Sequence, residues 1–360
     1  MSNENNQANP NICIFVAYAK EPSLSTLAYI DAIAKAGFSV IVINNAKTSS
    51  EFLDSLSKRC WRVYNRINIG RDIGAYKDGI LMLLEEGHLK RCGSLCLAND
   101  SMHFIPGFNG AAFTEEIKEF NASKDIALFS HASHQVSRHY QSYFQIVKSE
   151  VINSNEFMSF WREYRPLSHR EHCIHNGEIA LSSRVYNRIT KVRVLYTSER
   201  LLNSICKKNA EDQPSVDQIL GMMPSTSKTK QKKKQNYALD QLLLAASRSD
   251  VLSHINQHYF MDLLEASNPS HAGAFLFPTF ISCPLVKHDL CLAGSFSMAK
   301  ALRLFRLALT CSGLNEEEVS NHIDEYRQAI TSKGIPKDYE KKPIQRALRG
   351  INKEYIYTLD

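Results

Sequence analysis

The chain has 360 residues, of which 44% are hydrophobic and 22% are charged, and its 43 Lys and Arg against 37 Asp and Glu give a net charge of +6. This is an ordinary globular composition, and the chain is long enough to bury one large core or two smaller ones. The mildly basic balance favours anionic ligands or an anionic membrane surface and does not single out nucleic acid as a partner.

Cysteine usage and hydropathy predict a cytoplasmic protein, with peripheral contact at the inner face of the cell membrane as an extension of that location. The nine cysteines are scattered without a CxxC pair, which is typical of reduced thiols. Residues 1–10 are polar, lack the apolar core of a signal peptide and are predicted to be a disordered tail. No apolar run approaches the roughly 18 residues that a membrane span requires.

Residues 11–208 alternate strand-like and helix-like segments. The apolar run Ile12–Tyr18 predicts a buried strand, and helical spacing then runs from Thr26 to a glycine stop at Gly37. Next come a strand at Phe38–Asn44, a helix at Ser49–Lys58, a strand at Trp61–Arg66, a helix at Ala75–Gly87, and strands at Ser94–Asp100 and Asp125–His131. This alternation predicts a doubly wound α/β domain with a mainly parallel sheet.

The rest of the chain is predicted to be mostly helical. Helical segments are expected at Arg138–Glu150, Asn155–Tyr164 and Gly177–Ile189, followed by a late strand at Lys191–Tyr196. Residues 209–236 turn polar and end in a basic run, which predicts a linker or loop that is either simply solvated or an anchor to anionic phospholipid. Residues 237–360 form the predicted helical C-terminal region, where the amphipathic segment 296–310 is expected to pack on a core rather than anchor in a membrane.

The stretch RINIGRDIGAYKDG, at residues 66–79, combines glycines with charges of both signs between two ordered elements. Gly70 and Gly74 allow a tight turn and close approach of backbone to a ligand. Arg66 and Arg71 can bind phosphate in a bidentate manner, and Asp72 can accept a hydrogen bond from a sugar hydroxyl. A following helix would add its N-terminal N–H groups. The alternative is a strand-to-helix connection whose arginines face solvent.

A second stretch, LCLANDSMHF at residues 95–104, ends a buried strand in Asn99, Asp100 and Ser101. Mg²⁺ is commonly held by one or two carboxylates together with phosphate oxygens, so Asp100 alone suffices for a nucleotide-diphosphate site. The alternative is an Asx-turn that caps the strand. Since ligands bind beyond the carboxyl ends of strands in such sheets, both stretches are expected at the same site.

Histidines and one glutamate form a third group of candidates. The histidines fall into two sets, His131, His134 and His139, and His169, His172 and His175 with Cys173. Zinc binding is one interpretation, although no compact set of four ligands has matching spacing. Glu178 follows HNG where a helix is expected to begin. It is either a general base for an acceptor hydroxyl or a favourable charge at a helix N-terminus.

The motifs resemble those of the rhamnan synthesis protein F family, bacterial glycosyltransferases of polysaccharide and O-antigen assembly. The matching segments are NRINIGRDIGAYKDGI, LCLANDS, HYQSYF, FMSFWREY, HNGEIALS and NPSHAGAFLFPTFISCPLVKHDL, in that order. The resemblance implies a GT-A-like, Rossmann-like nucleotide-sugar-binding domain over residues 11–208. It also implies transfer of a sugar such as rhamnose from a nucleotide-diphosphate donor to a growing cell-surface glycan or lipid-linked glycan, including lipopolysaccharide.

By this resemblance, the nucleotide is held by Asn68, Gly70, Arg71 and Asp72. Asn99, Asp100 and Ser101 take the place of an Asp-x-Asp motif, with Asp100 binding Mg²⁺ or Mn²⁺. The sequence departs from that motif because no second aspartate lies two residues from Asp100. Glu178 takes the place of the acceptor-side base.

Sugar transfer needs charge stabilisation for the leaving diphosphate and a base for the acceptor hydroxyl. Arg71 and the helix start near Gly74 would supply the first, and Glu178 or His131 the second. We expect an inverting transferase, which requires only that one base. The alternative is a non-catalytic glycan- or nucleotide-binding module of a polysaccharide assembly complex, and a zinc hydrolase is a third reading.

Overall fold

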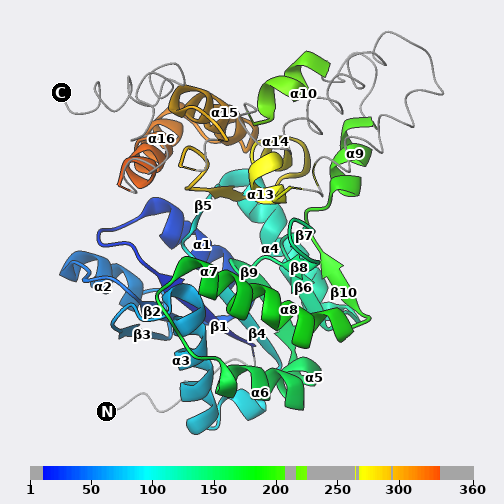
Figure 1. The fold of residues 1–360 in the computed structure, drawn as a ribbon. Helices are drawn as coiled ribbons and strands as arrows, with labels where there is room; N and C mark the ends of the chain where they lie inside the picture. Colours follow the sequence, from blue (N-terminus) through cyan, green and yellow to red (C-terminus); the bar gives the residue numbers. More distant parts are fainter. Residues whose placement is uncertain (1–10, 207–215, 225–263, 265–266, 293–294, 333–360) are drawn as a thin grey trace. The chain divides into compact units, whose positions relative to one another are not determined.

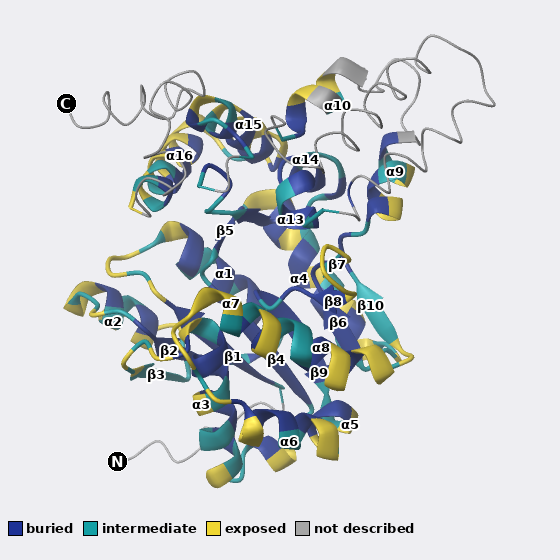
Figure 2. Ribbon diagram, in the orientation of Figure 1, coloured by how far each residue is buried: buried dark blue, intermediate teal, exposed yellow. Residues whose placement is uncertain are grey.

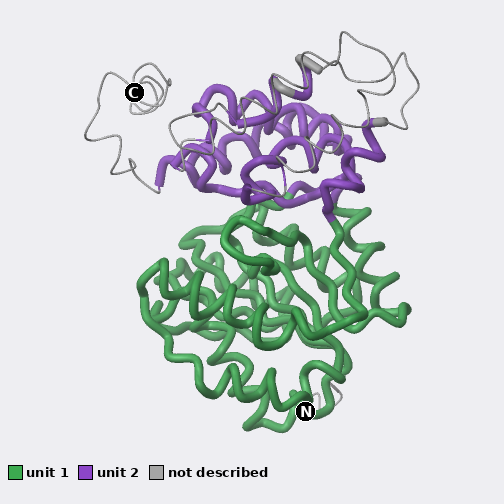
Figure 3. Tube along the Cα trace, turned by 45° about the vertical axis from the view of Figure 1, so that its right-hand side comes forward, with its two compact units in different colours: residues 1–104, 110–195 green, residues 105–109, 196–360 purple. Residues whose placement is uncertain are grey.

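The protein is described by a computed structural model that covers residues 11–206, 216–224, 264, 267–292 and 295–332. It divides into two compact units (Figure 3): unit 1 holds residues 1–104 and 110–195, and unit 2 holds residues 105–109 and 196–360. Unit 1 therefore ends at residue 195, whereas the sequence-based division carries the first domain to residue 208. The roles assigned to the predicted domains stay predictions.

The elements of unit 1 (Figure 1) begin with a strand–helix alternation. They are β1 (Asn11–Ala17), α1 (Leu24–Lys35), β2 (Ser39–Asn44), α2 (Ser50–Ser57), β3 (Arg62–Asn65), α3 (Arg71–Glu85), the 3₁₀ turn η1 (Leu89–Arg91), β4 (Ser94–Asn99), β5 (Met102–Phe104), α4 (Gly107–Ala122), β6 (Ala127–Phe129), β7 (Ala132–Ser133), β8 (His139–Tyr140), β9 (Phe144–Lys148), α5 (Ser149–Ile152), α6 (Asn155–Glu163), α7 (Arg170–His172), the π-helix η2 (Cys173–Ile179), α8 (Ala180–Arg184), the 3₁₀ turn η3 (Tyr186–Arg188) and β10 (Val192–Val194). Helix α4 starts in the segment 105–109 that belongs to unit 2.

The central sheet of unit 1 has seven strands in the order β10-β6-β9-β4-β1-β2-β3. All its pairings are parallel except those of β9, which runs antiparallel to β4 and β6. The prediction of a mixed α/β fold with a mainly parallel sheet is confirmed. Its finer assignment as GT-A stays a prediction.

Helices cover both faces of this sheet, and Figure 2 shows its inner strands as buried, whereas the edge strands β10 and β3 are only partly buried. On one face, Phe15 of β1 meets Tyr29 of α1 edge to face, with ring centroids 5.3 Å apart. On the other face, Ile14 packs on α3, so closely that a Cβ at Gly79 would lie 3.0 Å from its Cδ1. Right-handed crossovers require this arrangement, because the chain moves from β1 to β2 in one direction and from β3 back to β4 in the other.

The sequence-based prediction of a helix at Arg138–Glu150 is wrong. These residues form β8 and the buried β9 instead, with Ala98 of β4 opposite Phe144. Strand β9 is covered on both faces, so its burial is nearly continuous and lacks the alternation that reveals a strand. Helix α4 was not predicted, although Phe113, Ile117 and Phe120 are all buried at helical spacing.

Unit 2 is described as helices with one short strand. Its elements are α9 (Ser198–Cys206), α10 (Val216–Met222), α13 (Pro269–Ala272), α14 (Leu276–Ile281), β11 (Leu285–Lys287), α15 (Met298–Cys311) and α16 (Glu316–Thr331). Helix α10 falls inside the predicted linker, whose basic run 225–235 lies outside the described residues. The amphipathic segment forms α15 as predicted, with Met298, Phe305 and Leu309 buried. No helix in the described ranges combines the length and hydropathy needed to cross a bilayer.

Segment 105–109 is anchored in unit 2 by hydrogen bonds from Asn109. Its backbone N–H donates to the Ser312 Oγ at 2.9 Å, and its Nδ2 donates to the carbonyls of Pro278 and Cys283 at 3.0 and 3.1 Å. Asn109 is buried. A piece of chain from the middle of the first domain's sequence is therefore part of unit 2.

The β3–α3 connection of unit 1 is packed against the loop between α6 and α7. Gly70 has φ of +74°, and a Cβ on it would lie 2.3 Å from the Cβ of Pro166. The backbone N–H of Gly70 donates to the Ser168 Oγ at 3.2 Å. At Gly74, a Cβ would lie 2.3 Å from the Ile69 carbonyl oxygen and 3.3 Å from the Pro166 Cβ. Both glycines are thus required by packing within the chain itself.

Replacing Gly70 by alanine should destabilise the protein more than the same change at Gly87. Both glycines have φ of +74°, but no atom lies within 4 Å of the Cβ position at Gly87. Gly87→Ala should cost about 1–2 kcal/mol from backbone strain alone. Gly70→Ala should cost a further 1–3 kcal/mol, roughly, because Pro166 must move. Urea denaturation of the two variants measures the difference, and equal losses would show that the contact with Pro166 carries no free energy.

Candidate functional site

The carboxyl ends of β1, β2 and β4 meet at one edge of the sheet in unit 1. Strands β2 and β4 lie on either side of β1, so the strand order reverses at β1. Ligands of doubly wound sheets bind in the crevice at such a reversal. The two predicted stretches come together here, because the Asn99 Nδ2 at the end of β4 donates to the Asp72 Oδ2 on α3 at 3.2 Å.

Asp100 closes the reversal point between β1 and β4. Its Oδ2 accepts hydrogen bonds from the backbone N–H groups of Tyr18 at 2.5 Å and Ala19 at 3.0 Å, and its own N–H donates to the Val16 carbonyl at 3.1 Å. In Ser101 the backbone N–H donates to the Asn99 Oδ1 at 3.0 Å. The Asx-turn that the sequence allowed is therefore present at Asn99. The Asp100 carboxylate holds the loop that follows β1.

These residues fit a divalent cation only in part. They offer one carboxylate, and one oxygen of that carboxylate already accepts two backbone hydrogen bonds. Most of the ligands would have to come from phosphate oxygens and water. Within the part of the chain that the structure describes, no cluster of three or more His, Cys, Asp or Glu is placed to hold a metal ion. The two histidine sets therefore do not form a zinc site there.

A polar network joins Asp72 and Tyr76 in the first turns of α3 to Asn99 at the end of β4. The buried Asn99 donates from its Nδ2 to Asp72 and to the Tyr76 hydroxyl, the latter at 3.0 Å. The Tyr76 hydroxyl donates in turn to the Ser142 carbonyl at 3.0 Å. The network thus joins α3, β4 and the residues just before β9. Tyr76 and Ser142 were not among the candidate site residues predicted from the sequence.

The pKa of Asp72 is raised, first by burial and then by the negative charge of Glu178. Arg71 and hydrogen bonds from the backbone N–H groups of Ile73 and Asp72 itself act in the opposite direction. Those N–H groups belong to the first turn of α3. Because these N–H groups already donate to the Asp72 carboxylate, they are not free to bind phosphate. Of the two features that the sequence predicted for phosphate binding here, the helix N-terminus and Arg71, Arg71 remains.

The two arginines of the first stretch differ in their surroundings. Arg66 is held within the chain: its guanidinium donates to the Asn45 Oδ1 at 2.9 Å and the Ile69 carbonyl at 2.8 Å, and it pairs with Asp78 at 2.8 Å. Arg71 is exposed and has φ of +56°, in the left-handed region that residues other than glycine rarely adopt. Strain of this kind concentrates at functional sites. Arg71 rather than Arg66 is therefore placed to bind an external anion.

Asn68 lies between these arginines with one atom unsatisfied. Its Oδ1 is buried and has no hydrogen-bond partner, whereas its backbone carbonyl accepts from the Ser168 Oγ at 3.4 Å. A buried acceptor without a partner costs about 1–3 kcal/mol. The predicted nucleotide-binding residue therefore carries a buried acceptor that no described residue satisfies.

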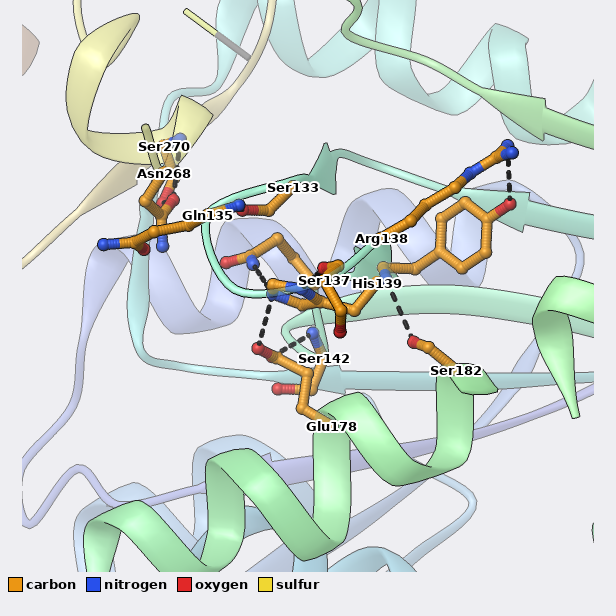
Figure 4. Close-up of polar contacts among 12 residues, drawn as sticks. Ser133, Gln135, Ser137, Arg138, His139, Ser142, Glu178, Ser182, Asn268 and Ser270 are labelled. Atoms are coloured by element: carbon orange, nitrogen blue, oxygen red, sulfur yellow. Dashed lines mark hydrogen bonds and ion pairs between the residues drawn. The ribbon is translucent and has the colours of Figure 1, made fainter. Parts of the chain in front are cut away.

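Glu178 lies in the π-helix η2 between α7 and α8 (Figure 4). Its Oε2 accepts from the Ser142 N–H at 2.8 Å, and its Oε1 lies 3.4 Å from the His139 Nε2. Burial acts to raise the pKa of Glu178, but the hydrogen bonds from His139 and Ser142 outweigh it and lower the pKa. Short π-helical insertions occur often at functional sites. Sequence reasoning found Glu178 and missed both of its partners.

His131 is buried in the loop after β6, beside β9. Its Nδ1 and the Tyr143 hydroxyl share a hydrogen bond of 2.8 Å, and its backbone carbonyl accepts from the Gln141 N–H at 3.1 Å. His131 and Glu178 are thus each engaged with residues 139–143.

Glu178 should stabilise the protein at neutral pH and lose that contribution in acid. A carboxyl whose pKa is lower in the folded state contributes above its unfolded pKa, about 4.3, and loses the contribution as the pH falls through the folded pKa. Glu178→Gln should cost about 1–3 kcal/mol at pH 7. The difference from wild type should shrink between pH 5 and pH 3 in urea titrations. A difference that does not depend on pH would show that the charge of Glu178 is not stabilising.

Comparison with known proteins identifies relatives but no activity. Residues 40–265 match the family model for rhamnan synthesis protein F. A relative from Sinorhizobium fredii (strain NBRC 101917 / NGR234), the uncharacterized protein y4gN, is 27% identical over 205 residues, which are 56% of this chain and 52% of the relative. The chain thus spans about half the length of that curated relative.

Among solved structures, a cytidylyltransferase from Leptospira borgpetersenii serovar Hardjo-bovis (strain JB197) aligns with a TM-score of 0.29 and 11% identity. The alignment covers 70% of this chain and 96% of that one. At this score the similarity supports no conclusion about fold or ligand. The family model, in contrast, matches more than half of the chain and confirms the resemblance seen in the motifs: the chain belongs to the rhamnan synthesis protein F family.

Proposed function

We propose that the protein is a glycosyltransferase of polysaccharide synthesis that uses a nucleotide-diphosphate sugar, with rhamnose as one candidate sugar. Family membership supports polysaccharide synthesis and a glycosyltransferase-like enzyme. The observation that carries the proposal is the position of Arg71 and Asp72 at the start of α3, joined through Asn99 to the end of β4 where the strand order reverses.

In this proposal Arg71 binds the diphosphate of the donor. It is exposed, it is strained, and its charge partly offsets the rise that burial causes in the pKa values of Asp72 and Cys173. A guanidinium at this position would stabilise negative charge on the leaving diphosphate.

Asp72 is the proposed base for the acceptor hydroxyl. The environments of Asp72 and Glu178 move the pKa values of the two carboxyls in opposite directions, and such pairs commonly divide acid–base roles. A carboxylate with a raised pKa accepts a proton more readily near neutral pH. Glu178, held on both oxygens, would then orient His139 and the start of β9. The sequence-based assignment of the base to Glu178 or His131 stays a competing prediction.

One base suffices for an inverting reaction, in which the acceptor oxygen attacks the anomeric carbon on the face opposite the leaving group. The acceptor proton goes to the base, and the bond to the diphosphate breaks. Mg²⁺ or Mn²⁺, if the donor brings it, would be held mainly by the diphosphate near Asp100. Asp100 supports the competing proposal of a non-catalytic binding module, since it already serves as a structural cap.

Donor binding should raise the melting temperature of the full chain by about 5 °C at a hundredfold excess over Kd. We would screen nucleoside diphosphates and their sugar conjugates with and without Mg²⁺ or Mn²⁺. Arg71→Gln should abolish the shift, whereas Arg188→Gln, at a surface arginine that pairs with Glu156 at 3.8 Å, should retain it. A metal-dependent shift that is lost in Asp100→Ala would assign the metal. No shift with any nucleotide would contradict the donor site and favour a glycan-binding module.

With the donor identified, release of the nucleoside diphosphate can be followed against pH. Asp72→Asn should slow the reaction by about 10²- to 10⁴-fold and remove the acid limb of the pH profile. Glu178→Gln and His131→Gln should slow it less and retain that limb. The reverse order would assign the base to Glu178 or His131. Retained anomeric configuration in the product would exclude the inverting mechanism.

A further inference from the structure

Three aliphatic side chains stand exposed on two neighbouring loops of unit 1. Ile67 and Ile69, in the β3–α3 loop, are 80% and 50% exposed, and Leu167, in the α6–α7 loop, is 54% exposed. We call these three residues the aliphatic rim. Single exposed aliphatic residues are common on protein surfaces, but a group of them marks an interaction site.

The β3–α3 loop and the α6–α7 loop lie side by side, because two hydrogen bonds and the contact between Gly70 and Pro166 join them. The Ser168 Oγ accepts from the Gly70 N–H at 3.2 Å and donates to the Asn68 carbonyl at 3.4 Å. Pro166 fills the space that a Cβ of Gly70 would need. The aliphatic rim is therefore one surface made from two parts of the chain.

Hydrogen bonds to backbone carbonyl groups hold the two loops that carry the aliphatic rim. The Ile69 carbonyl accepts from Arg66 at 2.8 Å, and the Leu167 carbonyl accepts from the Cys173 Sγ at 3.3 Å. The next carbonyl ahead of Pro166, that of Arg165, accepts from the His172 ring at 2.8 Å. The three aliphatic side chains are therefore exposed on loops whose backbone is held by hydrogen bonds.

Exposed arginines accompany the aliphatic rim. Arg165 and Arg170 bracket Leu167 on the α6–α7 loop, and Arg71 follows Ile69 on the other loop. Figure 2 shows the segment that leads into α7 as exposed. Between residues 165 and 171 the only acidic residue is Glu171, which pairs with His175 at 3.8 Å. The surface thus combines aliphatic side chains with a local excess of positive charge.

We propose that the aliphatic rim and its arginines dock unit 1 on an anionic phospholipid membrane. Aliphatic side chains would enter the boundary between headgroups and acyl chains, and the arginines would pair with lipid phosphates. These residues are other parts of the sequence than the basic run 225–235, which the sequence suggested as an anchor. The proposal does not depend on sugar transfer, although docking here would bring Arg71 close to the plane of the lipid headgroups.

Sedimentation with vesicles tests the proposal on the full chain, without nucleotide. Vesicles of phosphatidylcholine with 30% phosphatidylglycerol are compared with pure phosphatidylcholine. Ile67→Ser/Leu167→Ser should weaken binding to the anionic vesicles at least about tenfold, since two aliphatic side chains no longer leave water. Arg165→Gln should weaken it about fivefold. Val136→Ser is the control, because Val136 is 64% exposed in the same unit and outside the aliphatic rim.

All variants retain the basic run, so its contribution is constant across the comparison. Unchanged melting temperatures would show that the exposed substitutions leave the fold intact. Loss of binding in the double variant but not in Val136→Ser supports the proposal. Equal binding of wild type and double variant, no binding to anionic vesicles, or equal binding to both vesicle types would overturn it.

Discussion

The contact between Gly70 and Pro166 holds together the part of unit 1 on which the candidate site depends. It allows the β3–α3 loop to lie directly on the α6–α7 loop, because neither a Cβ at Gly70 nor a different backbone angle would fit there. Arg71 follows at once and takes the left-handed conformation that starts α3. The positions of Asp72 on one side and of the aliphatic rim on the other both follow from this junction.

The electrostatics of the site rest on two carboxyl groups in contrasting surroundings. Burial and the negative charge of Glu178 outweigh the hydrogen bonds that Asp72 accepts, so the pKa of Asp72 rises. Glu178 is also buried, but the Ser142 N–H and the His139 ring stabilise its charged form and its pKa falls. One carboxyl is thus prepared to exchange a proton and the other to remain charged. Strand β8 and the residues between it and β9 produce the difference, because His139 and Ser142 supply the donors to Glu178.

Local patterns in the sequence predicted much of unit 1. Strands β1, β2 and β4 are apolar runs bounded by polar residues. Helix α1 ends at Lys35, two residues before Gly37, where φ is +95°. The two polar stretches at the sheet edge were also predicted, because parallel strands place their carboxyl ends together. What could not be predicted was the partner of each residue. The hydrogen bonds of Asp100 reach back more than 80 residues to Tyr18 and Ala19.

The errors in prediction have one common origin. Segment 138–150 has aromatic and aliphatic residues at spacings that suit a helix as well as a doubly buried strand, and it was assigned as a helix. His139 and Ser142 could then not be placed beside Glu178. Likewise, the sequence predicted that Gly70 lets the backbone approach a ligand, whereas the residue that approaches it is Pro166, almost a hundred residues later.

The path of the chain between the units bears on how this family can evolve. Unit 2 includes residues 105–109, which contain the start of α4 and are bound through Asn109. A single cut after Leu195 would separate Asn109 from the Pro278 and Cys283 carbonyls that accept its hydrogen bonds. Recombination at one point in the gene, with exchange of the helical part, would therefore remove the acceptors of these hydrogen bonds and leave the buried Asn109 without them.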